Sequence, residues 1–272
     1  MKLVKTIEEI SNIYKRGTVG LVPTMGYLHE GHASLIKKSV EENDITIVTI
    51  FVNPTQFLPC EDLSTYPRNL DGDFLLCKNL GADYVFAPND SEIYPEKSLT
   101  QVSINSLADR LCGLTRPGHF SGVCLVVLKL FNIIKPNNAY FGSKDFQQLA
   151  IIKRMVKDLN ISVNIVSCPI VREKSGLALS SRNSYLTEKE KEDALVLYKA
   201  INYAKKYKEN DVKSLKLELY KIIEEKAKID YIEIVNRETL EEVSHMNEPS
   251  QLILAAYVGN TRLIDNSKLE AK

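Results

Sequence analysis

Apolar runs alternate with helical patterns over the first two-thirds of the chain, and this alternation limits the possible folds more than any other feature. Residues 18–22 and 45–52 are rich in β-branched and apolar side chains, as in strands that are buried on both faces. Apolar side chains recur at helical spacing in residues 70–80, and Gly81 follows as a predicted C-cap. The alternation continues with strands at 84–86, 139–141 and 161–166 and helices at 123–134 and 146–159. Repeated βα units predict an α/β fold with a doubly wound parallel sheet, in which ligands bind beyond the carboxyl ends of the strands.

The last third of the chain has a different pattern. Thr187 and Glu190 have the spacing of a capping box at a helix start, and charged helices follow. Three strands are then expected, at 231–235, 252–257 and 262–264. We therefore predict a first domain at residues 1–170 and a smaller α+β domain at residues 171–272 that closes over the site.

The composition excludes several classes of protein. The 272 residues are 44% hydrophobic and 26% charged, which is typical of a globular protein. The 35 basic and 35 acidic side chains give a formal net charge of zero, which argues against a general nucleic-acid binder. The start lacks the apolar run of a signal peptide, and no apolar stretch is long enough to span a bilayer. We expect a cytoplasmic protein with neither nucleic acid nor membrane as its partner.

The five cysteines occur singly along the chain. This arrangement is unlike a disulfide framework and fits reduced thiols in the cytosol. Cys77 and Cys124 fall in apolar helical patterns, so we predict that they pack in the core. Because no candidate base lies near any cysteine in the sequence, we predict no cysteine nucleophile.

The tetrad His29-Glu30-Gly31-His32 stands where a predicted strand meets a predicted helix. Residues 23–26 are expected to break the strand, and residues 33–40 continue as an amphipathic helix. Two imidazoles three residues apart at a helix start share one face. They then lie beside the unpaired backbone amides and the positive dipole end of that helix, where phosphate binds readily. The tetrad therefore suggests chemistry at a nucleotide phosphate.

Two other interpretations of the tetrad remain open at this point, a metal site and an exposed polar turn. Zinc metalloproteases use His-Glu-x-x-His, with the histidines four apart on a formed helix, whereas the spacing here is three. Only His119 and His245 remain as further histidines, and the chain has no Cys-x-x-Cys pair. We therefore assign no metal ligand among the protein side chains. The tetrad by itself leaves a functional and an incidental origin about equally open.

Two polar loops follow other predicted strands or precede helices. Asn53 and Gln56 come after the strand at 45–52, where neutral amides can hold hydroxyl and carboxylate groups. An ordinary turn containing Asn and Pro is the alternative there. Arg116 and His119 lie in a predicted loop before the next helix, where they can bind a carboxylate or phosphate or simply form a surface turn.

Another strand-to-helix junction includes Gly142, Lys144, Asp145 and Gln148. The glycine permits close backbone approach, and the lysine supplies a point charge suited to phosphates. Asp145 can accept hydrogen bonds from ribose hydroxyls or cap the helix that follows. Gln148 lies one turn into this helix and faces the same end of the sheet.

The segment Ser180-Ser181-Arg182 lies in a polar, basic stretch. Two hydroxyl groups and a guanidinium can close over a triphosphate and neutralise a departing pyrophosphate. A solvated loop between domains is the alternative.

These motifs together resemble the pantoate–β-alanine ligase (pantothenate synthetase) family. More widely, the chain looks like the Rossmann-like nucleotidyltransferase superfamily with a His-x-Gly-His signature. The matching blocks are collinear and cover nearly the whole chain: 23–26, 28–32, 51–57, 66–68, 93–95, 116–120, 142–148, 177–183 and 262–266.

The resemblance implies a reaction in two steps. ATP and (R)-pantoate form pantoyl adenylate and pyrophosphate with Mg²⁺, and the amine of β-alanine then attacks the acyl phosphate to give pantothenate and AMP. The carboxylate of pantoate is the nucleophile, so the enzyme aligns the reactants and stabilises charge at the α-phosphate. The resemblance also implies a homodimer through the N-terminal domain.

The same resemblance implies roles for particular residues. His29 and His32 contact the phosphates, His32 is the proton donor, and Lys144 is the third catalytic residue. Gln56 and Gln148 hold pantoate, and Asn53 is expected near the acyl pocket. ATP is expected to contact Met25, Gly26, Tyr27, Leu28, His29, Glu30, Gly31, His32, Gly142, Ser143, Lys144, Asp145, Val171, Leu179, Ser180, Ser181 and Arg182. Many family members have Glu where Ser143 stands, so the backbone at this position is expected to bind the nucleotide.

Three alternative functions predict different residues. A nucleotidyltransferase that makes a stable dinucleotide would share the tetrad but would not require both Gln56 and Gln148. A nucleotide-binding protein without activity predicts loss of phosphate-side residues, yet His32, Lys144 and Arg182 are all present. A tRNA synthetase is disfavoured because the chain has no anticodon-binding domain and no net positive charge.

Overall fold

The computed structural model describes residues 1–13, 16–59 and 61–271, so Cys60, one of the five expected free thiols, lies outside the described residues. The chain divides into two compact units. The first comprises Met1–Ser143 and Ile151–Pro169, and the second comprises Lys144–Ala150 and Ile170–Lys272. None of the helices in the described ranges is both long enough and apolar enough to cross a membrane.

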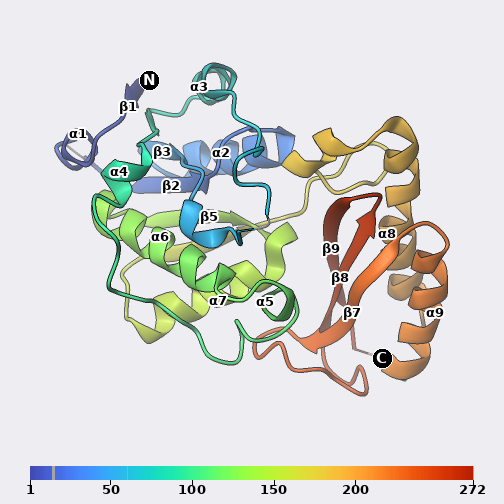
Figure 1. Cartoon of the computed structure of the whole chain (residues 1–272). Helices are drawn as coiled ribbons and strands as arrows, with labels where there is room; N and C mark the ends of the chain where they lie inside the picture. The colour runs from blue at the N-terminus through green and yellow to red at the C-terminus, as the bar shows by residue number, and fades with distance from the viewer. Residues whose placement is uncertain (14–15, 60, 272) are drawn as a thin grey trace. The chain divides into compact units, whose positions relative to one another are not determined.

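The first unit is built on a six-stranded sheet in the order β1-β4-β3-β2-β5-β6, and every neighbouring pair is parallel (Figure 1). The strands are β1 (Lys2–Val4), β2 (Val19–Thr24), β3 (Ile45–Ile50), β4 (Tyr84–Phe86), β5 (Asn138–Gly142) and β6 (Asn164–Cys168). The strand order reverses between β2 and β5, which makes this position the topological switch point. The predicted doubly wound parallel sheet is confirmed.

Helices connect these strands on both faces of the sheet. Their bounds are α1 (Ile7–Ser11), α2 (Glu30–Glu42), α3 (Leu70–Asn79), α4 (Asp90–Ile93), α5 (Cys112–Thr115), α6 (His119–Ile134) and α7 (Phe146–Asp158), with 3-10 turns η1 (Pro54–Gln56) and η2 (Ser143–Asp145). The inner sides of α2 and α3 pack on one face, where Ile36 and Cys77 join Val22 and Val48 in one core cluster. Helix α6 runs along the other face (Figure 1).

Strand β2 continues through Pro23, although residues 23–26 were expected to break it. The carbonyl of Thr24 accepts a hydrogen bond from Phe51, next to β3, at 3.1 Å. The backbone N–H and C=O groups of successive strand residues point toward opposite neighbouring strands. Thr24 points toward β3, so Pro23 points toward β5, and the pairing of β2 with β5 has already ended at Leu21. A residue without an N–H is tolerated there, since no ladder hydrogen bond is lost.

Other boundaries also differ from the expectation, among them the following in the first unit. Strand β6 begins at Asn164 and not at Ile161, because Ile161 still donates to the carbonyl of Val156 at the end of α7 at 3.0 Å. Strand β3 ends at Ile50, two residues early. Helix α6 begins at His119, within the segment expected to be a loop. The edge strand β1 was not predicted.

The second unit contains a three-stranded antiparallel sheet covered by two helices. Its elements are η3 (Ser181–Tyr185), α8 (Glu188–Lys206), α9 (Val212–Glu224), β7 (Lys228–Asn236), β8 (Ser250–Val258) and β9 (Thr261–Leu269). Thr187 and Glu190 form the expected capping box: the Thr187 hydroxyl accepts from the Glu190 amide at 3.2 Å, and the Glu190 carboxylate accepts from the Thr187 amide at 2.9 Å. The predicted α+β character of this part is confirmed.

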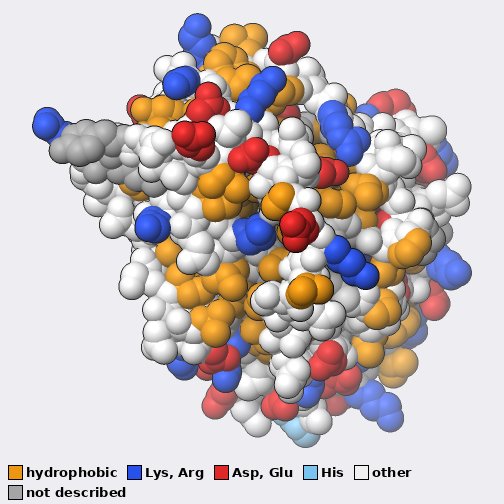
Figure 2. Space-filling view, turned by 60° about the vertical axis from the view of Figure 1, so that its left-hand side comes forward, with side chains coloured by type: hydrophobic (Ala, Val, Ile, Leu, Met, Phe, Trp, Pro, Cys, Tyr) orange, Lys and Arg blue, Asp and Glu red, His pale blue; other side chains and the backbone are white. Residues whose placement is uncertain are grey.

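The surface agrees with the balanced composition. On the face shown in Figure 2, basic and acidic side chains are interspersed and are separated by apolar and neutral residues. The full chain carries equal numbers of Lys plus Arg and Asp plus Glu, 35 of each. On this face, mixed charges of this kind give no broad field of one sign.

Candidate active site

Three of the predicted motifs lie at the carboxyl edge of the parallel sheet, around the switch point. Strands β3, β2 and β5 are consecutive neighbours in the sheet. Residues 25–32 follow β2, Asn53 and Gln56 follow β3, and Gly142 ends β5. A Cβ atom added at Gly142 would meet no atom within 4 Å, so this backbone is open to close approach.

The turn between β2 and α2 has a backbone that its neighbours hold firmly. Gly26 and Tyr27 have φ angles of +83° and +52°. A Cβ at Gly26 would come within 2.9 Å of Ile50, so glycine is needed there for space as well as for conformation. The Thr24 hydroxyl accepts from the Gly26 amide at 3.1 Å and donates to the Thr49 carbonyl at 2.6 Å. These contacts set the direction in which the chain enters α2.

Asp73 of α3 holds the other side of this turn. Its two carboxylate oxygens accept hydrogen bonds from the amides of Tyr27 and Leu28 at 2.8 and 2.7 Å. Asp73 is 4% exposed. Burial raises the pKa of this carboxyl group, and the two amide hydrogen bonds oppose that shift. Sequence reasoning missed Asp73, because nothing in the local pattern distinguishes it from exposed Asp71 on the same helix.

His29 and His32 cap helix α2 with their own rings. His29 is the N-cap residue, and its Nδ1 accepts from the Gly31 amide at 3.1 Å. The Nδ1 of His32 accepts from the His29 amide at 3.3 Å, so the two imidazoles form a reciprocal capping box. The ring centroids lie 4.1 Å apart. Since both Nδ1 atoms accept, the hydrogen-bond network places the ring hydrogens on the Nε2 atoms.

Asn53 organises the amide group of Gln56. Asn53 is 1% exposed, and its Nδ2 donates to Gln56 Oε1 at 3.0 Å and to the Gly122 carbonyl at 3.1 Å. Its Oδ1 accepts from the Tyr94 hydroxyl at 2.9 Å. Gln56 Nε2 in turn contacts the Met25 sulfur at 3.0 Å. The polar atoms of Asn53 are thus engaged within the protein, and the residue fixes which end of the Gln56 amide is the donor.

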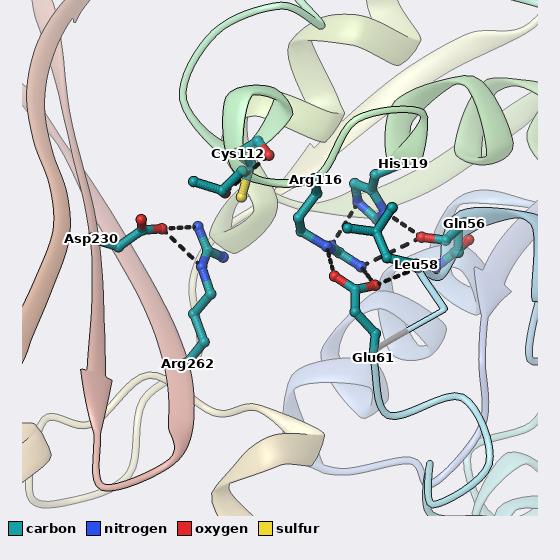
Figure 3. A network of polar contacts seen from close by, with 9 residues as sticks. Gln56, Leu58, Glu61, Cys112, Arg116, His119, Asp230 and Arg262 are labelled. Carbon is teal, nitrogen blue, oxygen red and sulfur yellow. Dashed lines mark hydrogen bonds and ion pairs between the residues drawn. The ribbon is translucent and has the colours of Figure 1, made fainter.

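Arg116 and His119 hold the backbone of Gln56 (Figure 3). The Arg116 guanidinium makes a two-pronged ion pair with Glu61, through Nε to Oε1 and through Nη2 to Oε2 at 2.6 Å. Its Nη1 lies 3.0 Å from His119 Nε2, and His119 Nδ1 lies 2.7 Å from the Gln56 carbonyl. A carbonyl only accepts, so His119 carries its hydrogen on Nδ1 and accepts at Nε2. Glu61 also accepts from the Leu58 amide at 3.0 Å.

The structure therefore assigns Arg116 and His119 an internal role. The sequence left open a ligand-binding loop or a surface turn; this partly buried network is not a surface turn, and ligand binding there stays a prediction. Burial raises the pKa of Glu61, but the hydrogen bonds from Arg116 and Leu58 outweigh that effect, and the pKa lies below its usual value. Glu61 was not predicted, since it lies 55 residues from its partner in the sequence.

Four of the expected free thiols fall within the described residues: Cys77, Cys112, Cys124 and Cys168. All four are buried, and the predicted packing of Cys77 and Cys124 in the core is confirmed. Burial raises the pKa of Cys77 and Cys124 to about 12 and that of Cys168 to about 11. Thiols of such pKa are poor nucleophiles at neutral pH.

The second unit contains the other predicted motifs. Residues 171–179 form a hairpin, in which Arg172 and Ala178 pair and the Leu179 amide donates to the Val171 carbonyl at 3.0 Å. The hairpin leads into Ser180, the N-cap of η3, whose hydroxyl accepts from the Arg182 amide at 3.3 Å. A small pocket in this unit is lined by Lys144, Leu177, Ala178, Ser180, Asn183, Leu197, Leu263, Ile264 and Asp265.

The two compact units share the predicted site residues between them. Those of the first unit are Met25, Gly26, Tyr27, Leu28, His29, Glu30, Gly31, His32, Asn53, Gln56, Gly142 and Ser143. Those of the second unit are Lys144, Asp145, Gln148, Val171, Leu179, Ser180, Ser181 and Arg182. Within the described ranges, no group of three or more His, Cys, Asp or Glu side chains is arranged to hold a metal ion.

Known proteins resemble this chain over nearly its whole length. A family model described as "Pantoate-beta-alanine ligase" matches residues 2–268. The pantothenate synthetase of Caldicellulosiruptor bescii is 52% identical over 282 residues, which cover all of both chains. The crystal structure of pantothenate synthetase from Thermus thermophilus has a TM-score of 0.91 at 41% identity and covers 98% of this chain and 99% of its own.

A further solved structure carries ligands. It is the pantoate-beta-alanine ligase from Francisella tularensis, complexed with "Beta-gamma ATP and Beta-alanine". Its TM-score is 0.83 at 40% identity, covering 98% of this chain and 97% of that one. The matches in sequence and in fold extend over nearly the whole chain. This chain therefore belongs to the pantoate-beta-alanine ligase family, and its activity is the synthesis of pantothenate.

Proposed function

We propose that this chain joins (R)-pantoate to β-alanine through a pantoyl adenylate. A carboxylate oxygen of pantoate attacks the α-phosphorus of ATP, and the bond between this phosphorus and the pyrophosphate oxygen breaks. The amine of β-alanine then attacks the acyl carbon, loses a proton, and displaces AMP. No covalent bond to the enzyme is needed, so alignment and charge stabilisation are the tasks of the protein.

The capping box of His29 and His32 carries this proposal. Both Nδ1 atoms accept backbone hydrogen bonds at the start of α2, so the Nε2–H groups are the ring donors. Charge builds up on the α-phosphate oxygens when the carboxylate attacks. Two imidazole donors at a helix N-terminus are suited to stabilise that charge, and His32 is assigned the transfer of a proton to it.

Gln56 is assigned to pantoate, together with Gln148. The contacts of Asn53, Met25 and the Arg116–His119 pair fix both the side chain and the backbone of Gln56. A neutral amide held in one orientation can recognise the hydroxyl groups of pantoate without attracting the carboxylate away from the phosphorus. Asn53 acts in this proposal by orienting Gln56 beside the acyl group.

The nucleotide is assigned to residues of both units. Lys144, Ser180, Ser181 and Arg182 hold phosphates, and a lysine ammonium with an arginine fork is well matched to them. Met25, Gly142, Asp145, Val171 and Leu179 line the adenosine side. The Francisella ligase was solved with "Beta-gamma ATP and Beta-alanine", which supports a nucleotide and β-alanine as ligands of a relative 40% identical to this chain.

Mg²⁺ enters this proposal as the partner of ATP. No carboxylate cluster among the described residues fits a resident cation. Triphosphate oxygens and water are ligands that Mg²⁺ commonly retains in nucleotide enzymes, so the donor set is compatible with delivery as MgATP. The ion would neutralise the departing pyrophosphate.

We further propose a cytoplasmic homodimer that associates through the N-terminal domain. The four described cysteines are free and buried, which fits a reducing compartment. Analytical ultracentrifugation of the full chain tests the dimer: a mass near twice 30.7 kDa is expected, and a monomer at micromolar concentration contradicts it.

The adenylate step is tested by exchange of labelled pyrophosphate into ATP in the presence of pantoate and Mg²⁺, without β-alanine. Exchange that requires pantoate supports a reversible adenylation. The contrary result is a folded protein that makes pantothenate with Mg²⁺ yet shows no exchange. It would contradict an adenylate formed without β-alanine and indicate a reaction that requires the amine from the start.

A further inference from the structure

The block of residues 262–266 is part of the resemblance described from the sequence, yet no step of the proposed reaction uses it. It lies on strand β9 of the second unit, where Asp265 and Asn266 are 3% and 4% exposed. Buried polar side chains are retained where they are hydrogen-bonded, so their partners indicate what the block does. Both side chains contact segments that the proposed function assigns to ATP.

Asn266 holds the backbone of Lys144. Its Nδ2 donates to the Lys144 carbonyl at 2.7 Å, across 122 positions of sequence. Its Oδ1 accepts from Gln251 Nε2 on the adjacent strand β8 at 2.7 Å. A carbonyl can only accept, so the Asn266 atom beside the Lys144 carbonyl is the side-chain nitrogen Nδ2. The oxygen Oδ1 therefore faces Gln251, whose Nε2 must be the donor. Strand β9 therefore holds the turn η2 that contains Lys144 (the Lys144 turn), and β8 supports the Asn266 side chain that makes this contact.

Asp265 holds the hairpin of residues 171–179. Its carboxylate accepts two hydrogen bonds from Arg172, at 2.6 and 2.8 Å. The same guanidinium donates to the Gly176 carbonyl at 3.0 Å and lies 4.8 Å from the centre of the Tyr198 ring. Asp265 Oδ1 also accepts from the backbone N–H of Asn266 at 2.8 Å, which links the contacts of Asp265 with those of Asn266.

The hairpin transmits this anchoring to its ends. Arg172 pairs with Ala178 across the hairpin, and the Leu179 amide bonds to the Val171 carbonyl at 3.0 Å. The Ala178 carbonyl accepts from Asn183 Nδ2 at 3.1 Å, which ties the hairpin to η3. A guanidinium held in a bidentate pair has little freedom, so the flanking backbone is fixed as well.

We propose that Asp265 and Asn266 are positioning residues for the nucleotide: one strand, β9, holds both the Lys144 turn and the 171–179 hairpin at the spacing that ATP requires. They act through Lys144, Val171 and Leu179 and do not touch ATP themselves. The inference rests on the proposed function only in that these residues contact ATP.

The test is ATP binding by Asn266→Ser, with Ser267→Ala as the matched control. Ser267 is the next residue of β9 and is similarly buried, and its hydroxyl donates to the Lys268 carbonyl. Calorimetry with MgATP, in the absence of pantoate, measures the dissociation constant directly. We expect Asn266→Ser to weaken ATP binding by about tenfold, as for loss of one buried hydrogen bond, and Ser267→Ala to change it by less than about twofold.

The steady-state constants separate positioning from general damage. Asn266→Ser should raise the KM for ATP and leave the KM for pantoate within about twofold of the wild type. In a Lys144→Ala background, the same change should weaken ATP binding by less than about threefold, because the group that it positions is gone. Fully additive losses, or equal losses for ATP and pantoate, would overturn the inference.

Two further results keep the test decisive. If Asn266→Ser does not fold, Asp265→Asn replaces it, since it weakens the two-pronged pair with Arg172 and keeps the size of the side chain; unchanged ATP binding by that folded variant overturns the inference. A wild type that binds ATP but shows no pantoate-dependent pyrophosphate exchange contradicts the adenylate proposal alone. A wild type that fails to bind ATP contradicts both.

Discussion

At the scale of single residues, His29 and His32 serve the fold and the proposed chemistry with opposite sides of the same rings. Their Nδ1 atoms cap α2, and this leaves the hydrogens on Nε2. His119 has the reverse tautomer, because its Nδ1 faces the Gln56 carbonyl and its Nε2 faces Arg116. Hydrogen-bond partners, and not residue type, thus decide which histidines can donate to a ligand.

Substitutions of His32 can separate the two roles. Asparagine places its amide oxygen near the position of Nδ1, whereas glutamine reaches the position of Nε2. We expect His32→Asn to keep the cap and to lower pantoate-dependent pyrophosphate exchange by about 10²-fold or more, because a phosphate donor is lost. His32→Ala should lose similar activity and, in addition, about 1 kcal/mol of unfolding free energy. Full activity in a folded His32→Asn protein would show that His32 only caps the helix.

The buried thiols give a second prediction at this scale. Burial raises the pKa of Cys77 and Cys124 to about 12, so both are neutral at pH 8. We expect neither to be alkylated by iodoacetamide in the native protein at pH 8, and both to react within minutes in urea. Mass spectrometry of the peptides measures this, and rapid native labelling of either residue would contradict the packing described.

At the scale of elements, helix α3 determines the shape of the turn that precedes α2. Asp73 receives the amides of Tyr27 and Leu28, while Thr24 and Gly26 fix the other end. The first motif of the proposed active site is therefore supported by an element that follows it by about 40 residues in the chain. Strand β9 supports backbone segments of the second unit in a similar way, since it holds the Lys144 carbonyl and the Arg172 guanidinium.

Removal of the Asp73 carboxylate should destabilise the turn between β2 and α2. We expect Asp73→Ala to lower the free energy of unfolding at pH 7 by about 2 kcal/mol, because two amides in a buried turn lose their acceptors. Asp71→Ala is the control, since Asp71 is exposed in the same turn of α3. Urea unfolding measures both; equal small losses for the two variants would show that water replaces Asp73 at no cost.

The charge of Asp73 also predicts a pH dependence. Burial raises its pKa in the folded protein, so the folded state holds the proton more tightly than the unfolded state. The proton-linked part of the stability at Asp73 is then complete below its unfolded pKa, about 3.9, and is lost as the pH rises through the folded pKa, whereas the two amide hydrogen bonds do not require the proton. Wild type should lose unfolding free energy relative to Asp73→Asn between pH 4 and pH 7. A relative gain over this range would contradict the direction of the shift.

At the scale of the whole molecule, two units with separate cores share the residues proposed to bind one nucleotide. The second unit has its own cluster of buried side chains from α8, α9 and the antiparallel sheet. The first unit has a core between the parallel sheet and α2 and α3. A ligand that contacts residues of both units should stabilise the native state of each.

Thermal unfolding tests this expectation. A ligand at 100 times its dissociation constant stabilises the native state by about 2.7 kcal/mol. We therefore expect saturating MgATP to raise the Tm of the wild type by several degrees and to raise that of Lys144→Ala much less, measured by differential scanning calorimetry. An equal rise in Tm for both proteins would show that Lys144 does not contribute to phosphate binding.

Elements with strong local signals were predicted well from the sequence. Strand β4 has the expected bounds at 84–86, and the capping box at Thr187 needs only residues three apart. Strand β1 was missed, since three residues carry little pattern and form a strand only by pairing with β4. Pro23 was expected to end β2, yet it is tolerated because the neighbouring pairing with β5 has already ended.

The sequence by itself determined the doubly wound sheet, the second α+β unit and the motifs beside the switch point, because these depend on periodicity and on short spacings. Only the tertiary structure decided that Arg116 and His119 support Gln56, that Asp73 holds the turn before α2, and that Asn266 holds Lys144. Each of these contacts joins residues 45 to 122 positions apart. A hydrogen bond across such a separation leaves no local pattern, since its partners become neighbours only when the strands and helices between them have packed.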